Sequence, residues 1–145
     1  MVRDLKQSVS TDEAALFEFY DRYAAALTRR DLDGVLACLN LPLVVRLPEE
    51  TVFIRERVEM ASKNLELFEQ YDRLSVVQVI CRPTSLRRLS GGSATCTAEW
   101  TLIDKDAMRL PSTEIPYILE NSDEGWKVVA LDLADRVNTG RALGW

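Results

Sequence analysis

The sequence predicts a single α+β domain in which N-terminal helices pack on a strongly curved antiparallel sheet. The first half of the 145-residue chain carries mainly helical hydrophobic spacing, and the second half carries strand-like segments separated by short polar turns. Turns of hairpin length join antiparallel neighbours, and helices followed by strands are the α+β order. We expect one domain over 1–145, with a core of about 11–134 and a polar C-terminal tail.

Three helices are expected. The first begins near Ser10, which forms a capping-box pattern with Glu13, and its buried face follows i, i+3, i+4 spacing at Leu16, Phe19, Tyr20, Tyr23 and Leu27. Asp31 is placed to cap a short second helix. A third helix is expected over about 56–71, and its spacing predicts a buried face formed by Val58, Ala61, Leu65 and Phe68.

Two short strands, 43–47 and 51–54, are expected between the second and third helices. Four longer strands follow, at about 74–80, 94–103, 108–119 and 126–133. The clearest alternation puts one face on Ala94, Cys96, Ala98, Trp100 and Leu102. The other face then carries Thr95, Thr97, Glu99 and Thr101, which is typical of a half-buried strand. A bent sheet leaves a cavity against its helices, where a ligand is expected to sit.

The charge balance argues against a nucleic-acid partner. The formal net charge is -5 and the pI about 4.8, whereas phosphate binding requires a basic surface. One basic group lies near a predicted hairpin tip, and a solvated strand edge accounts for Arg82, Arg87 and Arg88. No apolar run is long enough to cross a bilayer, and the first residues lack the apolar core of a signal peptide. We therefore expect a cytoplasmic protein with no membrane partner.

Cysteine and histidine usage narrows the chemistry further. Cys38, Cys81 and Cys96 are widely spaced, so reduced and buried thiols are the simplest account. The chain has no histidine, which removes histidine-ligated metals and Ser-His or Cys-His nucleophilic catalysis. The Gly-rich segment at 90–93 sits between predicted strands, where a hairpin turn explains it. We expect no metal and no cofactor.

A family resemblance rests on two segments. The first is Tyr20-Asp21-Arg22-Tyr23-Ala24-Ala25-Ala26-Leu27 followed by Asp31-Leu32-Asp33-Gly34, which resembles the first two helices of bacterial ketosteroid isomerases. The second is the turn Asp123-Glu124-Gly125-Trp126-Lys127 near the end. From about Thr11 to Ala134 the chain resembles the nuclear transport factor 2-like superfamily, which also includes scytalone dehydratase, limonene epoxide hydrolase and SnoaL-like polyketide cyclases. The resemblance implies a cone-shaped fold that hosts many unrelated activities, often as a homodimer.

The catalytic residues of these relatives carry over poorly. The oxyanion-hole tyrosine of the isomerases matches Tyr23, but their general-base aspartate falls on Leu47 and their protonated aspartate near Pro116. Leucine cannot accept a proton, so the isomerase mechanism is not expected unless a displaced carboxylate such as Glu114 substitutes. The histidine base of a dehydratase-like site is missing. The predicted strands also lack the Arg-x-Asp relay of an epoxide hydrolase.

Five residues remain as site candidates, each with a structural alternative. Tyr23 is predicted either to hydrogen-bond a ligand oxygen or to be a core aromatic. Arg46 either meets a ligand carboxylate or is solvated. Glu114 and Asp132 lie in apolar strands, and alternation places Asp132 on the face that lines the pocket, where burial would favour acid–base work. Otherwise they are paired outside. Trp100 fills the core or walls the pocket.

Three functions fit these residues. The first is a small SnoaL-like lyase, isomerase or cyclase in which Tyr23 polarises an oxygen and Asp132 or Glu114 moves a proton. The second is a non-catalytic pocket for an apolar or aromatic small molecule. The third is an interaction module that dimerises through the outer sheet face and has a vestigial pocket. A carboxylate opposite Tyr23 favours the first, a closed apolar pocket the second, and a filled pocket the third.

Overall fold

The computed structural model describes residues 2–134, with the side chains of residues 13–89 and 91–134. Its helices are α1 (Val2–Thr28), α2 (Leu32–Leu36) and α3 (Arg57–Arg73). Its strands are β1 (Leu39–Arg46), β2 (Thr51–Ile54), β3 (Val76–Arg88), β4 (Ser93–Asp104), β5 (Thr113–Ser122) and β6 (Gly125–Asp132), with a 3-10 turn, Ser90–Gly92, before β4. The predicted polar tail lies outside the described residues.

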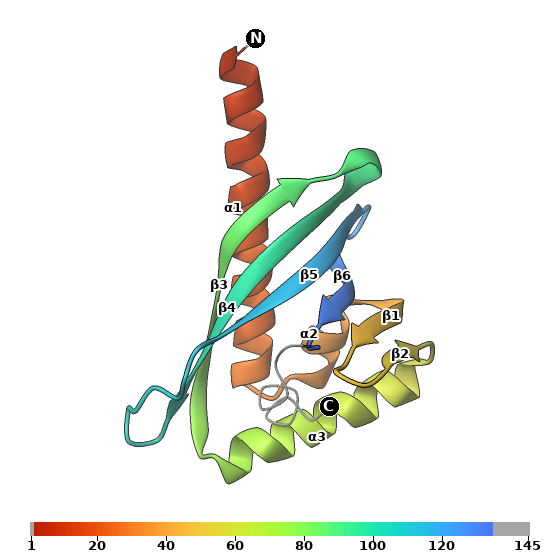
Figure 1. Ribbon diagram of the computed structural model, residues 1–145. Coiled ribbons are helices and arrows are strands. Elements are labelled where there is room, and N and C mark those ends of the chain that lie inside the picture. The colour runs from red at the N-terminus through yellow and green to blue at the C-terminus, as the bar shows by residue number, and fades with distance from the viewer. Residues whose placement is uncertain (1, 135–145) are drawn as a thin grey trace.

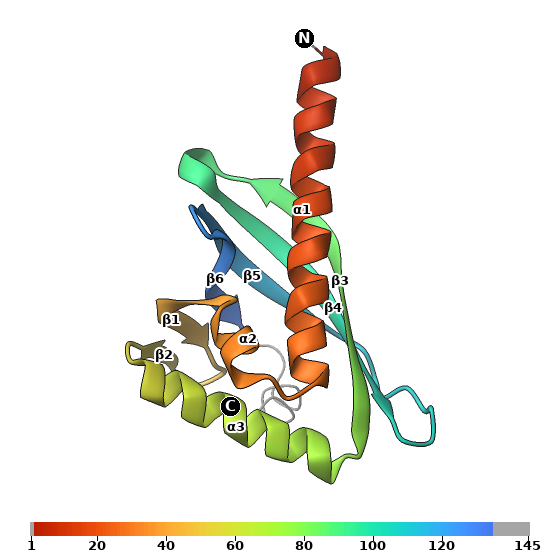
Figure 2. The same ribbon diagram turned by 180° about the vertical axis from the view of Figure 1, so that it is seen from behind.

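The six strands form one curved sheet in the order β2-β1-β6-β5-β4-β3, with α1 and α3 on its inner side (Figures 1 and 2). The expected α+β fold is therefore confirmed. One pairing differs from the expected antiparallel pattern, because β1 and β6 run parallel, with Val44 opposite Ala130. Parallel neighbours need a long connection, and the whole stretch from β2 to β5 supplies it here. None of the described helices is long and apolar enough to cross a membrane.

Helix α1 buries the predicted face. Leu16, Phe19, Tyr20 and Leu27 are each at most 2% exposed, and Tyr23 is partly buried against the same core. The helix begins at Val2 rather than near Ser10, so the predicted cap lies inside it. Its first turns project beyond the sheet (Figure 1). The expected cap of α2 is present, because Asp31 accepts a hydrogen bond from the Gly34 amide at 3.1 Å.

Helix α3 buries a different face from the one its sequence predicts. Val58 and Leu65 are 70% and 50% exposed. Phe68, the last residue of the predicted face, is buried as expected, and it is joined in the core by Met60, Asn64, Leu67 and Tyr71. The spacing predicts a rotated face because Val58 and Leu65 are apolar although they lie on the solvent side of the helix. This face matters for the site, since Asn64 and Tyr71 contribute its polar atoms.

The end of α1 is fastened to the free edge of β3. The Thr28 hydroxyl accepts a hydrogen bond from the Val79 amide at 2.9 Å, and the Arg30 guanidinium donates to the Val76 carbonyl at 2.8 Å. Arg30 also pairs with Asp72 at the end of α3, at 3.2 Å. These contacts satisfy backbone groups that an edge strand otherwise leaves open. They join α1, α3 and β3 at one corner of the molecule.

The two faces of the sheet are set by alternation and by one irregularity in β6. Along β4 the predicted alternation is present, with Thr101 as the exception because it is buried and hydrogen-bonded to Ser112 at 2.9 Å. In β6 the register shifts, so that Leu119 faces Val128 whereas Ile118 faces Ala130. The extra residue turns Ala130 and Asp132 to the outer face. The prediction that Asp132 lines the inner pocket is therefore wrong.

Candidate functional site

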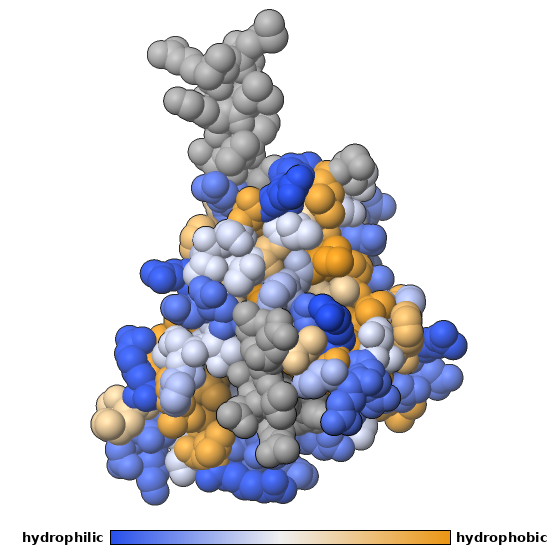
Figure 3. Space-filling model, viewed as in Figure 1, coloured by the Kyte–Doolittle hydropathy of each residue, from blue (hydrophilic) through white to orange (hydrophobic). Residues whose placement is uncertain are grey.

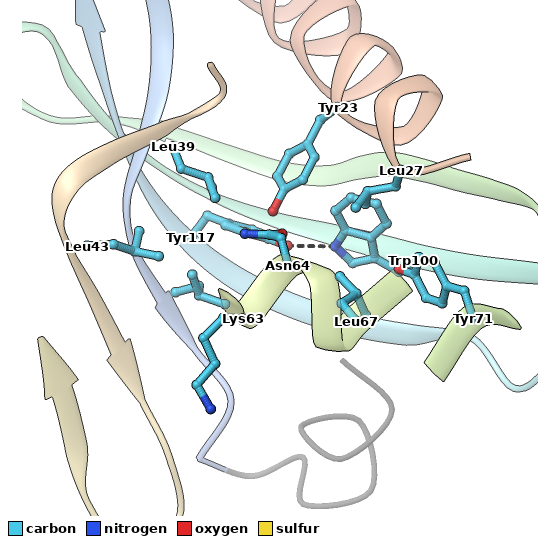
Figure 4. Close-up of a pocket in the computed structure, with 11 residues that line it drawn as sticks. Tyr23, Leu27, Leu39, Leu43, Lys63, Asn64, Leu67, Tyr71, Trp100 and Tyr117 are labelled. Carbon is cyan, nitrogen blue, oxygen red and sulfur yellow. Dashed lines mark hydrogen bonds between the residues drawn. The ribbon is translucent and has the colours of Figure 1, made fainter. Parts of the chain in front are cut away.

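The space between the helices and the sheet is almost filled. A gap of about 30 Å³ remains there, lined from α1 by Tyr23, from α3 by Asn64 and Tyr71, and from β4 and β5 by Trp100 and Tyr117 (Figure 4). A buried water needs at least ~10–15 Å³ measured in this way, so the gap accommodates one or two waters. An organic ligand does not fit unless surrounding side chains move. A gap therefore lies between the sheet and the helices, where a ligand cavity was expected, but it is smaller than an organic ligand.

The polar atoms around the gap are mostly hydroxyls. Trp100 donates its indole N–H to the Tyr117 hydroxyl at 2.7 Å, which is the hydrogen bond drawn in Figure 4. The Tyr71 hydroxyl is buried and has no partner among the described residues. The Tyr23 hydroxyl points toward Asn64 and Tyr117 (Figure 4), and Asn64 donates to the Met60 carbonyl one turn earlier. At least one hydroxyl group at the gap, that of Tyr71, therefore makes no hydrogen bond with the described residues.

The chemistry of these groups is that of neutral hydrogen-bond donors. Burial raises the pKa of Tyr23, Tyr71 and Tyr117 well above the usual value, because a charged phenolate would lose its hydration. None of the described residues that line the gap is an aspartate or a glutamate. The site can thus hold an acceptor oxygen. The one cation among its described lining residues is Lys63, whose ammonium lies 3.6 Å from the Glu66 carboxylate.

The structure separates the sequence-predicted site residues into two groups. Tyr23 and Trp100 lie together at the inner gap. Arg46, Glu114 and Asp132 lie on the outer face, where Arg46 and Asp132 form an ion pair at 3.1 Å. No inward carboxylate therefore faces Tyr23 within the described residues. Asn64 and Tyr71 were not among the sequence-predicted site residues. The helical spacing of α3 could have identified them, but the buried face predicted from that spacing did not include them.

The outer face carries a larger hollow, of about 420 Å³. Its floor crosses the middle of the sheet and is formed by Val44 of β1, Ala130 of β6, and Pro116 and Ile118 of β5. Cross-strand pairing keeps Val44, Ala130 and Ile118 in one row. Figure 3 shows hydrophobic surface on this side of the molecule. Ile118 is 42% exposed, which makes it an apolar side chain open to water in the centre of a sheet face.

Polar groups frame this hollow. Thr95 and Thr97 of β4 border one side, and Thr51 with the Arg46–Asp132 pair borders the other. The Arg46 side chain is 65% exposed and the Asp132 side chain 33%. An apolar floor with a polar rim is found both at protein interfaces and at small-molecule sites.

Comparison with solved structures gives the fold. An NTF-2 like protein of unknown function from Shewanella oneidensis is 16% identical, with a TM-score of 0.62 over 82% of this chain and 95% of its own. A cystatin-like domain of unknown function from Nostoc punctiforme is 17% identical, with a TM-score of 0.64 over 84% of this chain and 75% of its own. A candidate calcium/calmodulin-dependent protein kinase type II association domain from Thiobacillus denitrificans is 16% identical, with a TM-score of 0.62 over 79% of this chain and 89% of its own.

The sequence itself places the chain in a family. Comparison with curated proteins found no match. The family model described as "NTF2-like protein (DUF6841)" matches residues 12–135, which includes all six strands. This match and the fold agree, and the chain belongs to the DUF6841 family of NTF2-like proteins.

Proposed function

We propose that the protein is a non-catalytic assembly module that associates with a second copy of itself through the outer face of the sheet. The observation that carries this proposal is the contrast between the two sides of the sheet. The inner gap measures about 30 Å³ and has no carboxylate among the residues of 2–134 that line it, whereas the outer hollow measures about 420 Å³ and has an apolar floor. A filled interior suits a structural core, and an exposed apolar hollow suits a partner.

The energetics favour covering this surface. Burial of apolar area stabilises by about 25 cal/mol per Å², and Val44, Pro116 and Ile118 expose part of theirs to water. The Thr and Arg side chains of the rim keep hydrogen-bonding capacity at the edge, where an interface tolerates water. One neighbour of the same fold is named as an association domain, which supports assembly as a use of this scaffold.

A charge placed on the floor tests the proposal. Ile118→Glu introduces a carboxylate into the centre of the expected interface, where ionisation without a partner opposes burial. Leu65→Glu is the matched control, because Leu65 is a similarly exposed apolar residue (50% against 42%) on α3. We expect sedimentation velocity to show a dimer for the wild type and the control, and a monomer for Ile118→Glu. A dimer that survives Ile118→Glu contradicts the proposal.

A second candidate function is binding of a small aromatic or apolar molecule at the inner gap, and it rests on the unpartnered Tyr71 hydroxyl. The notion of a SnoaL-like lyase or isomerase belongs to this candidate, with Tyr23 polarising an oxygen. Leu67 lines the gap, so Leu67→Ala enlarges it. A phenol that raises the melting temperature of this variant, but not of a Leu67→Ala/Tyr71→Phe variant, supports it. Equal shifts in both variants count against a site formed by Tyr71.

A further inference from the structure

An exposed aromatic side chain stands beside the outer hollow, on the same face. Phe53 of β2 is 54% exposed and pairs across the strands with Val44, whose side chain forms part of the floor. The Arg55 guanidinium lies over the Phe53 ring, with its central carbon 6.0 Å from the ring centroid. Phe and Arg are both enriched in protein interfaces relative to the rest of the protein surface.

Phe53 does not fill the hollow of its own chain. Two strand intervals separate β2 from β6, and adjacent strands lie about 4.8 Å apart, so Phe53 and Ala130 are separated by roughly 10 Å across the sheet. The row that Phe53 begins continues through Val44 and Ala130 to Ile118. One face therefore presents an apolar projection at its edge and an apolar recess at its middle.

We propose that Phe53 of one copy inserts into the outer hollow of a second copy, and that the second copy returns the same contact. This inference rests on the proposed function, and it names the residue that the partner contributes. A twofold interface requires one surface patch to be complementary to itself, so that when residue i contacts residue j, j also contacts i. A projection and a recess side by side on one face meet that requirement, and the pair of insertions buries both aromatic rings.

The charges around the projection and the recess agree with this arrangement. Arg55 is exposed and lies next to Phe53, so a partner that receives Phe53 also meets its positive charge. Carboxylates lie on the receiving face, at Asp132 on the rim and at Glu114 farther along β5. Arg46 reaches Asp132 through only one of its nitrogens, Nη1, at 3.1 Å. A guanidinium that arrives with the ring meets acidic groups at the edge of an apolar floor, which steers the two copies into one register.

An engineered disulfide tests the contact directly. The double variant Phe53→Cys/Ala130→Cys places one thiol on the projection and one on the floor. Within a single chain their separation exceeds the 7 Å limit between Cα atoms for a disulfide, so a bond between them joins two chains. The native thiols at Cys38, Cys81 and Cys96 are all buried, which leaves the introduced pair as the accessible one among the described residues. Because Phe53→Cys also removes the aromatic ring, the oxidation is carried out at chain concentrations well above the raised dissociation constant, where we expect a covalent dimer on a non-reducing gel.

Two controls separate this inference from the proposed function. The variant Leu65→Cys/Ala130→Cys moves one thiol to α3 and is expected to give no covalent dimer. Phe53→Ala, with its own fold checked by circular dichroism, is expected to raise the dimer dissociation constant at least tenfold. If the wild type dimerises and Ile118→Glu breaks the dimer, but neither Phe53 variant has its expected effect, the Phe53 contact is wrong and the assembly face stands. A wild-type monomer at all concentrations contradicts both.

Discussion

Arg30 is expected to contribute more to the free energy of unfolding than any exposed arginine among the described side chains. Its side chain is only 22% exposed, and it donates to the carbonyls of Leu27, Thr28 and Val76 at 3.2, 3.1 and 2.8 Å. Its guanidinium carbon also lies 5.2 Å from the centroid of the Tyr71 ring. One residue thereby connects the end of α1 with α3 and with the edge of β3.

The magnitude follows from the separate contacts. A hydrogen bond to a charged group contributes about 1.5–3 kcal/mol to stability. Arg30 makes such a bond to the part-buried Val76 carbonyl. The cation–π contact adds about 0.5–2 kcal/mol. The Asp72 side chain is 70% exposed, so this ion pair adds at most about 1 kcal/mol. Because such terms overlap, Arg30→Ala is expected to lower the free energy of unfolding by about 2–4 kcal/mol, or roughly 6–12 °C in melting temperature.

Urea titration at a fixed chain concentration measures this loss, since association also stabilises the folded state. Arg29→Ala is the matched control, because its side chain is 64% exposed and its contact with Asp31 is 3.6 Å long. The control is expected to lose less than about 0.5 kcal/mol. Two variants that unfold at the same urea concentration would refute the reasoning that Arg30 fastens this corner.

Three further outcomes are expected. Tyr117→Phe leaves the Trp100 indole N–H without its acceptor and should cost about 1–3 kcal/mol in urea unfolding, whereas Tyr71→Phe removes a hydroxyl that has no described partner and should cost less than about 0.5 kcal/mol. Asp31→Ala removes the cap of α2 and should cost about 1 kcal/mol by the same measurement. Burial raises the pKa of Cys38 from 9.0 to about 11, so the folded chain keeps a proton that the unfolded chain releases. Stability should therefore be intact below pH 9 and fall between pH 9 and 11, as thermal melts at pH 8 and 10.5 would show; a melting temperature that rises over this range would contradict the assignment.

The helices and strands were predictable where local chemistry decides them. The spacing of apolar residues in α1 predicts its buried face because this helix has one apolar side, which is the side that packs on the core. Asp31 predicts the start of α2 because its carboxylate accepts a hydrogen bond from the Gly34 amide. The alternation of apolar and polar residues in β4 predicts that Trp100 points inward, because successive side chains of a strand point to opposite faces. These features depend on residues that are neighbours in sequence, so the sequence contains the information needed.

The features that were missed depend on tertiary context. The face of α3 was misassigned because Val58 and Leu65 are apolar yet exposed, and periodicity alone does not separate an exposed apolar residue from a buried one. The position of Asp132 was misassigned because the extra residue in β6 is visible only in its pairing with β5. The size of the inner gap depends on how Tyr71 and Trp100 pack, which no pattern of residue types specifies.

Light scattering on the unmodified protein, coupled to size-exclusion chromatography from low to high micromolar concentration, tests the central claim most directly. If the outer face is an assembly surface, the measured mass should approach twice the chain mass of 16.4 kDa as concentration rises. It should return to 16.4 kDa in the Ile118→Glu variant at the same concentrations. A wild-type mass that stays at 16.4 kDa throughout this range would contradict self-assembly through this face.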